Sequence, residues 1–477
     1  MIQPIIRMRQ AIASRMRQRQ RRVDADLVVG AGTLYEVPKR LDEQDIHCVM
    51  VVTSPGFVRR GVIASFTRDL LVHGVTAAVF SDVNRDPDIA CAEQVAAFFR
   101  SHGCEAIVAI GGGSVIDCAK VAGALVARPK KQVHDFVGSM KIGTPIPYLV
   151  AVPTTAGTGS EASAMAVVVD EEQQRKLVIS DFALIPDIAV LDANLLVDLS
   201  PTQTALAGMG ALSHAVEAYL NRYGSRSVRA NAAEAVMLIF KNLKASYDDG
   251  DNVKRREDLL MASYYAGVAS SNAMTGYVDA LSRIVSARYR VQQNLVEAVL
   301  LPVILREYGK AAESRLAQLA VMVGLHGETE LSLATHFVAK VRSLAESLDI
   351  PAGLAEIHEA DIPVLAAQAE AEANPACPVP EVWGPERFEN VLHAVKMVES
   401  VNGGTSSKEV AETADAVSVA GAAAREEENG GAQLNPSRIR PGSAPSRRRK
   451  ARIAATGGLT VAAAVAATIV AIRVRKK

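Results

Sequence analysis

Three consecutive glycines and a serine have the residue types and the position of a phosphate-binding loop: Gly111, Gly112, Gly113 and Ser114. They directly follow an apolar stretch at residues 106–110 and precede a stretch whose apolar residues have helical spacing. Glycines let a backbone approach a diphosphate closely, and the first N–H groups of a helix are free to donate to it. The loop therefore predicts a diphosphate site, although the same glycines could be needed only for the turn.

A second loop, residues 153–161, supplies hydroxyl groups and glycines after another apolar stretch at residues 148–152. The carboxyl ends of parallel strands lie at one edge of their sheet, and nucleotides bind in the crevice outside that edge. Two such loops together predict a dinucleotide crevice.

The elements that must position these loops are short apolar stretches separated by helix-length segments such as residues 89–102. Continuous apolar strands between helices are typical of a parallel sheet buried on both faces. The second half of the chain is rich in alanine and leucine at 3.6-residue spacing, for example at residues 231–247 and 316–323. We therefore predict a Rossmann-like α/β domain over residues 24–200 and an all-helical domain over residues 201–400. The expected strands include residues 47–52, 77–80, 106–110 and 148–152.

Composition excludes several classes of protein. Of the 477 residues, 49% are hydrophobic, which is enough for a large core. The 52 basic residues balance the 52 acidic ones, and only 4% of residues are aromatic, so we expect no nucleic-acid partner. The five cysteines include no C-x-x-C pair, which argues against a disulfide scaffold or a thiolate zinc site and suits a reducing cytosol.

The two ends of the chain differ from its body. Residues 1–23 contain seven arginines among scattered apolar residues, which predicts a short basic, partly amphipathic helix. This segment could be a solvated leader, or it could be a helix for membrane contact, targeting or packaging.

Residues 401–452 have the composition of a flexible linker. Residues 453–472 are 20 uncharged residues, long enough to span a bilayer, and the basic residues 473–477 follow them. Eight of the 20 are alanine, so a soluble or partner-docking helix is the alternative to a membrane anchor.

The two loops carry a family resemblance. Residues 111–120 and 153–161 resemble the signature loops of the iron-containing (group III) alcohol dehydrogenases, and residues 208–219 and 271–277 resemble further motifs of that family. The resemblance implies the dehydroquinate synthase-like fold, with the active site between an NAD(P)-binding domain and a helical metal domain. It implies that residues 111–114 bind the pyrophosphate of NAD or NADP, and that four side chains lie along the ribose and nicotinamide: Thr154, Thr155, Thr158 and Lys176. It also implies a dimer or larger assembly.

The metal-binding motifs depart from that family. The family holds its metal with one aspartate and three histidines. Here Gly210 replaces the aspartate, His214 matches the histidine four residues later, and Asp279 and Gln293 replace the other two histidines. Arg283 replaces a further histidine that lies beside the nicotinamide in the family. A catalytic divalent metal needs about three protein ligands, so only His214 and Asp279 remain as metal-ligand candidates and a bound metal is in doubt. The alternative interpretation is that His214 is a structural residue of its helix and not a metal ligand.

The nucleotide side is altered as well. Ser54 stands where the family often has an acidic residue after the first strand. A carboxylate there would bind the adenosine ribose and disfavour a 2′-phosphate, so its loss relaxes that discrimination and NADP is no longer excluded.

Three functional hypotheses follow. The first is a catalytically degenerate dehydrogenase-like protein that keeps its NAD(P) cleft, has its body in the cytoplasm, is anchored in a membrane by its C-terminus, and assembles with itself or with active paralogues. The second is an active alcohol or aldehyde oxidoreductase with a rearranged metal site. The third is a scaffold or packaged cargo protein.

Overall fold

Six parallel strands form the central sheet, in the order β1-β9-β6-β4-β2-β3. This architecture comes from a computed structural model that describes residues 3–19 and 24–397. The strands are β1 (Asp26–Val29), β2 (Cys48–Val52), β3 (Thr76–Phe80), β4 (Ala106–Gly111), β6 (Tyr148–Pro153) and β9 (Ile188–Leu191). The structure confirms the predicted parallel sheet and its four expected strands. The strand order reverses between β2 and β4, which is where doubly wound sheets open a crevice for a ligand.

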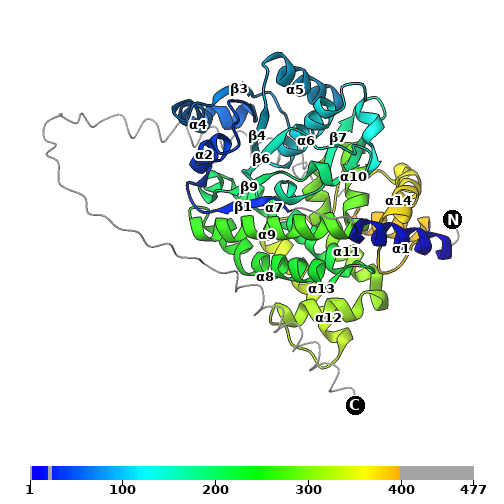
Figure 1. Ribbon diagram of the computed structural model, residues 1–477. Coiled ribbons are helices and arrows are strands. Elements are labelled where there is room, and N and C mark those ends of the chain that lie inside the picture. Colours follow the sequence, from blue (N-terminus) through cyan, green and yellow to red (C-terminus); the bar gives the residue numbers. More distant parts are fainter. Residues whose placement is uncertain (1–2, 20–23, 398–477) are drawn as a thin grey trace, which may run out of the picture. The chain divides into compact units, whose positions relative to one another are not determined.

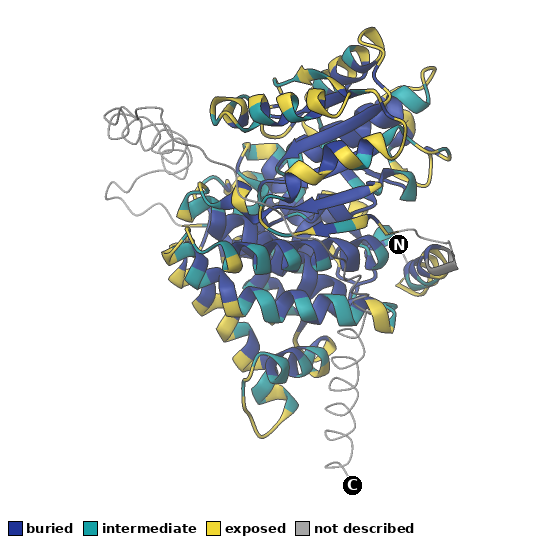
Figure 2. Ribbon diagram, turned by 60° about the vertical axis from the view of Figure 1, so that its left-hand side comes forward, coloured by how far each residue is buried: buried dark blue, intermediate teal, exposed yellow. Residues whose placement is uncertain are grey.

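The alternation of side chains along β4 explains why this strand is apolar throughout. Val108 and Ile110 belong to one hydrophobic cluster, whereas Ile107 and Ala109 belong to the other. The first cluster includes residues of α4 (Val62–Val72) and continues into the helical half of the chain. The second includes residues of α5 (Ile89–Ser101) and α6 (Gly113–Ala127). Both faces of the sheet are therefore covered, and Figure 2 shows its central strands in the dark blue of buried residues, whereas every residue of the edge strand β3 is intermediate or exposed. Two short helices, α2 (Val37–Asp42) and α3 (Pro55–Arg59), complete this half.

A second, three-stranded sheet was not expected from the sequence. It contains β5 (Gly138–Ser139), β7 (Met165–Asp170) and β8 (Arg175–Ser180), with β7 and β8 paired as an antiparallel hairpin. This hairpin follows the second predicted loop, and it carries Lys176.

The regular elements from residue 201 to residue 395 are helical, as predicted. They are α7 (Pro201–Leu220), α8 (Arg226–Asp248), α9 (Val253–Ala273), α10 (Tyr277–Tyr289), α11 (Gln293–Tyr308), α12 (Glu313–Met322), α13 (Glu330–Ser347), α14 (Ile362–Ala376) and α15 (Pro385–Val395). Helix α7 is buried on every side, since it packs against α8, α9 and α11 (Figure 1). Its start is fixed by Ser200, whose hydroxyl accepts a hydrogen bond from the Gln203 N–H, and by Pro201 in the first turn.

The basic N-terminal segment forms the predicted helix, α1 (Gln3–Arg19), but it is not a solvated leader. Ile6 and Gln10 are fully or almost fully buried, and α1 lies beside α14 (Figure 1). Arg17 donates hydrogen bonds to the Ser271 carbonyl on α9 at 2.6 Å and to the Ser180 hydroxyl on β8 at 2.9 Å. One face of α1 thus connects the hairpin with the helical half.

The remaining expectations for the chain ends concern the linker at 401–452, the span at 453–472 and the basic tail at 473–477. All three segments lie outside the described residues. Within residues 3–19 and 24–397, no helix is both long enough and apolar enough to cross a bilayer.

We expect Arg17→Ala to lower the free energy of unfolding by about 1–3 kcal/mol, because two buried hydrogen-bond acceptors lose their charged donor. Arg15→Ala, on the exposed side of the same helix, should change it by less than about 0.5 kcal/mol. Urea titrations followed by circular dichroism measure both, and equal effects of the two substitutions would contradict the docked position of α1.

Candidate active site

A cleft of about 270 Å³ joins the predicted nucleotide loops to the helical half of the chain. It is bounded by the N-terminus of α6, the second loop, the β7–β8 hairpin and helices α7, α10 and α11. Eight of the ten residues predicted for the site line it: Gly112, Gly113, Ser114, Thr155, Thr158, Lys176, His214 and Asp279. Gly111 and Thr154 do not line it. They are the last residue of β4 and the residue after β6, and the Thr154 N–H donates to the Gly111 carbonyl at 3.0 Å.

The two nucleotide loops touch at the cleft wall. Helix α6 begins at Gly113, so its free N–H groups face the cleft edge. A Cβ atom at Gly113 would lie 2.5 Å from the Thr158 hydroxyl, which is closer than any real contact. Glycine is therefore needed here for the approach of the second loop as well as for that of a ligand. The interpretation that these glycines serve the fold and the interpretation that they serve a nucleotide are compatible.

Lys120 fixes the second loop from beneath. Its side chain is fully buried on α6, and its ammonium donates to the carbonyls of Ser160 and Ser163, both at 2.6 Å. Two buried carboxyls lie near it. Burial raises the pKa of Glu161 to about 7, and burial also raises the pKa of Asp117, which lines the cleft. A single lysine charge thus faces two acids, and the loop is held by charge as well as by backbone contacts.

Lys176 extends from the hairpin across the cleft. Its ammonium lies 2.6 Å from a carboxylate oxygen of Asp86 and donates to the Gln293 side-chain oxygen at 3.3 Å. Gln293 is the first residue of α11, so Lys176 connects the nucleotide side of the cleft to the helical side. Ser54 has a different position: it directly precedes α3 after β2, its side chain makes no capping hydrogen bond, and it is not among the residues lining the cleft.

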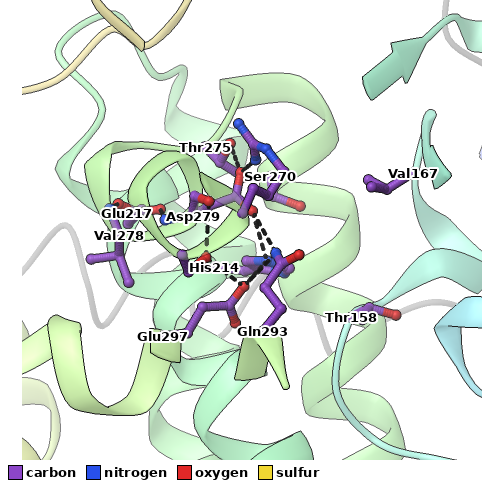
Figure 3. A network of polar contacts seen from close by, with 12 residues as sticks. Thr158, Val167, His214, Glu217, Ser270, Thr275, Val278, Asp279, Gln293 and Glu297 are labelled. Carbon is purple, nitrogen blue, oxygen red and sulfur yellow. Dashed lines mark hydrogen bonds and ion pairs between the residues drawn. The ribbon is translucent and has the colours of Figure 1, made fainter. Parts of the chain in front are cut away.

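At the helical side, three buried side chains face one another: His214 of α7, Asp279 of α10 and Glu297 of α11 (Figure 3). The ligand atoms of the three residues lie within 4.8 Å of one another. The His214 Nε2 atom is 3.9 Å from Asp279 Oδ1 and 3.8 Å from Glu297 Oε1, which is too far for hydrogen bonds. The Gln293 amide closes the group, donating to Glu297 Oε1 at 2.9 Å and to Asp279 Oδ1 at 3.2 Å.

The position of Asp279 is set by its own helix. The Glu217 carboxylate accepts hydrogen bonds from the N–H groups of Gly276 at 2.9 Å and Val278 at 2.6 Å, so it caps the first turn of α10. Arg283, one turn further along α10, forms an ion pair with Asp279 Oδ2, which also accepts from the Thr275 hydroxyl. The sequence placed Arg283 near the metal site, and the structure shows that its charge is paired.

The protonation of this group follows from its burial. Burial disfavours the charged form of Asp279, yet Arg283 and then His214 hold the pKa of this carboxyl below its ordinary value. Burial raises the pKa of Glu297, and the neighbouring Asp279 charge adds to that rise. One guanidinium therefore compensates one of two buried carboxyls, and the second is left without a fixed positive partner.

These residues fit a divalent cation. One imidazole and two carboxylates are ordinary ligands for such ions. Two buried atoms of the group have no hydrogen-bond partner within the described part of the chain, His214 Nδ1 and Glu297 Oε2. Sequence reasoning found His214 and Asp279 but missed Glu297. The sequence offered one signal for Glu297: it lies four residues after Gln293, which puts both side chains on one face of a helix.

Comparison with known proteins shows the family. Residues 25–193 match the iron-containing alcohol dehydrogenase family, and residues 204–396 match the C-terminal domain of the same family. The chain belongs to the iron-containing alcohol dehydrogenase family. It is 31% identical over 346 residues to the NAD-dependent methanol dehydrogenase of Bacillus methanolicus, covering 72% of this chain and 91% of that protein. It is 32% identical over 331 residues to the 1,3-propanediol dehydrogenase of Klebsiella pneumoniae, covering 68% and 85%.

Solved structures of iron-containing alcohol dehydrogenases and related proteins share the fold. A 1,3-propanediol oxidoreductase superposes with a TM-score of 0.75 at 29% identity, covering 78% of this chain and 98% of that one. The alcohol dehydrogenase of Oenococcus oeni gives a TM-score of 0.75 at 26% identity, covering 79% and 99%. These matches confirm the predicted family and fold.

Gly113→Ala should weaken NADH and NADPH binding at least about tenfold, because the added methyl group displaces Thr158 and closes the approach to the N-terminus of α6. Gly384→Ala is a matched control, since a Cβ there meets no atom within 4 Å. Enhancement of reduced-nucleotide fluorescence on titration gives both dissociation constants. Unchanged binding by the Gly113 variant would contradict the proposed location of the diphosphate.

Proposed function

We propose that this protein is an NAD(P)-dependent oxidoreductase that interconverts a small alcohol and the corresponding aldehyde. The observation that carries the proposal is the single cleft that joins the helix N-terminus at Gly113 to the buried group of His214, Asp279 and Glu297. The relatives support it, because a methanol dehydrogenase and a 1,3-propanediol dehydrogenase act on small alcohols by name.

The side chains of the cleft have separable tasks in this proposal. The loop glycines and the N-terminus of α6 bind the dinucleotide diphosphate, and Thr155 and Thr158 lie along the dinucleotide. Lys176, held by Asp86, orients the ligand from the opposite wall. His214, Asp279 and Glu297 would hold a divalent cation, which when bound polarises the oxygen of the alcohol or aldehyde. Their burial keeps bulk water away from the reacting end of the cleft.

A second candidate is the catalytically degenerate protein suggested by the replaced ligands. One observation favours it: Arg283 and Gln293 donate to the buried carboxylates, so part of the group is satisfied by the protein itself. In that case the cleft would bind NAD(P) without turnover. The count of ligands that suggested degeneracy did not include Glu297, and for that reason the active enzyme is our first proposal.

We expect the purified full chain, supplied with Mn²⁺, Fe²⁺ or Zn²⁺, to oxidise NADH or NADPH in the presence of aldehydes of one to four carbons. His214→Ala should reduce kcat/KM by about 100-fold or more, since the only imidazole of the group is lost. His336→Ala, on the exposed side of α13, should leave it unchanged. Nucleotide binding without turnover for every aldehyde and every metal would reject the enzyme and leave the degenerate protein.

We also retain as proposals a cytoplasmic body, a C-terminal membrane anchor and assembly with itself or a paralogue. The anchor rests on the 20 uncharged residues at 453–472. Full-length protein should pellet with membranes, whereas a chain ending at residue 452 should not. Identical fractionation of the two chains would reject the anchor, and the native mass of the shorter chain measures self-assembly.

A further inference from the structure

We propose that Glu297 replaces the carboxylate that is missing at position 210, so that His214, Asp279 and Glu297 form a new ligand set for one divalent cation such as Mn²⁺ or Fe²⁺. The inference rests on the proposed function for its place in the cleft, but metal binding can be measured without turnover.

The first argument is one of space. Gly210 and His214 lie one turn apart on α7, so a side chain at position 210 would point to the same side as the imidazole. A Cβ atom at Gly210 would lie 3.1 Å from Glu297 Oε2 and 3.0 Å from the amide carbon of Asn294. The volume that an aspartate at position 210 would need is therefore filled from α11. Gly210 and Glu297 are compatible with each other, whereas two carboxylates would compete for one position.

The second argument is the separation of the donor atoms. The imidazole Nε2 lies 3.8 Å and 3.9 Å from one oxygen of each carboxylate. Two ligand atoms that share an ion at about 2.1 Å, with a tetrahedral or wider angle between them, lie about 3.4–4 Å apart. The side chains are 9% exposed for His214, 5% for Asp279 and 1% for Glu297, so the point between them is shielded from solvent.

The third argument is the division of the oxygens of Asp279. Its Oδ2 atom is taken by Arg283 and Thr275, whereas its Oδ1 atom faces His214. The guanidinium therefore neutralises the outer oxygen, and the inner one accepts, from the residues that the structure describes, only the hydrogen bond of the Gln293 amide, which a bound ion would replace. Glu297 Oε2 has no partner within the described residues, which leaves the second carboxylate incomplete as well. The other oxygen, Glu297 Oε1, accepts from the Gln293 amide. A buried carboxylate oxygen without a partner is costly, and a dication bound by Glu297 would remove that cost.

The ligand types indicate which ions to test. Carboxylate oxygens with one imidazole suit ions such as Mn²⁺ and Fe²⁺, whereas thiolate sites select softer ions. Mn²⁺ is the practical probe, because its six-line electron paramagnetic resonance signal is lost on binding to protein.

The experiment titrates Mn²⁺ into the chelator-treated full chain and follows the free-ion signal. We expect one Mn²⁺ per chain. Glu297→Gln should weaken binding at least about tenfold, and Glu307→Gln, the same change near the other end of α11 and outside the cleft, should not. Gly210→Asp alone should also weaken binding, because its side chain meets Glu297. The double variant G210D/E297Q should bind within about tenfold of the unaltered chain, since a carboxylate then returns in the same place.

Each outcome bears on the proposal. Absence of bound Mn²⁺, or equal affinity of the Glu297→Gln and unaltered chains, would overturn it. Rescue by G210D/E297Q would support it even if Glu297→Gln alone is unstable, because a purely structural glutamate would not be replaced by an aspartate on another helix. Metal binding without turnover would reject the proposed function alone, whereas turnover by a chain that binds no Mn²⁺ in the titration would reject the ligand set alone.

Discussion

Two carboxylates buried beside one imidazole are the constraint on which this cleft depends. Asp279 and Glu297 come from different helices and have little solvent around them, so their charges must be met by groups built into the fold. Arg283 meets one of them, and the backbone N–H groups capped by Glu217 fix the start of the helix that carries both Arg283 and Asp279. The packing of α7, α10 and α11 around one another is therefore an electrostatic requirement as well as an apolar one.

The opposite wall of the cleft is fixed by close approach. The first loop ends β4, the second ends its neighbour β6, and the register pairs Gly111 with Pro153. Contact between Gly113 and Thr158, together with the buried ammonium of Lys120, leaves the second loop little freedom. This rigidity has a functional consequence, because a helix N-terminus binds an anion well only when its N–H groups are already aligned. The two walls are joined by Lys176, which contacts Asp86 on one side and Gln293 on the other.

The sequence was most informative where the determinants are local. Four strands and the glycine loop were predicted because each is encoded in a few consecutive residues, and the helical half was predicted from its spacing. The docking of α1 was not predicted, because Gln10 and Arg17 form hydrogen bonds with residues that are more than 160 positions away in the sequence. The β7–β8 hairpin was missed because Met165–Asp170 is almost entirely apolar in sequence, and its alternation between intermediate and buried positions becomes apparent only in the structure. Glu297 was missed for a related reason: its closeness to Gly210 becomes apparent only when α11 is packed against α7.

The substitutions in the metal motifs are easier to understand together than one at a time. The resemblance implies one carboxylate and three neutral imidazoles in the family, a formal charge of about −1 before any ion binds. Here two carboxylates and the guanidinium of Arg283 give the same sum with different residues. Random loss of ligands would leave a cavity beside position 210 and an unpaired carboxylate at position 279, and both would destabilise the fold. Instead, the glycine at position 210 is filled by a glutamate, and the added aspartate is paired with an added arginine. This mutual adjustment is the physical argument for our proposal of a rearranged site, and it is the reason that we rank the degenerate protein second.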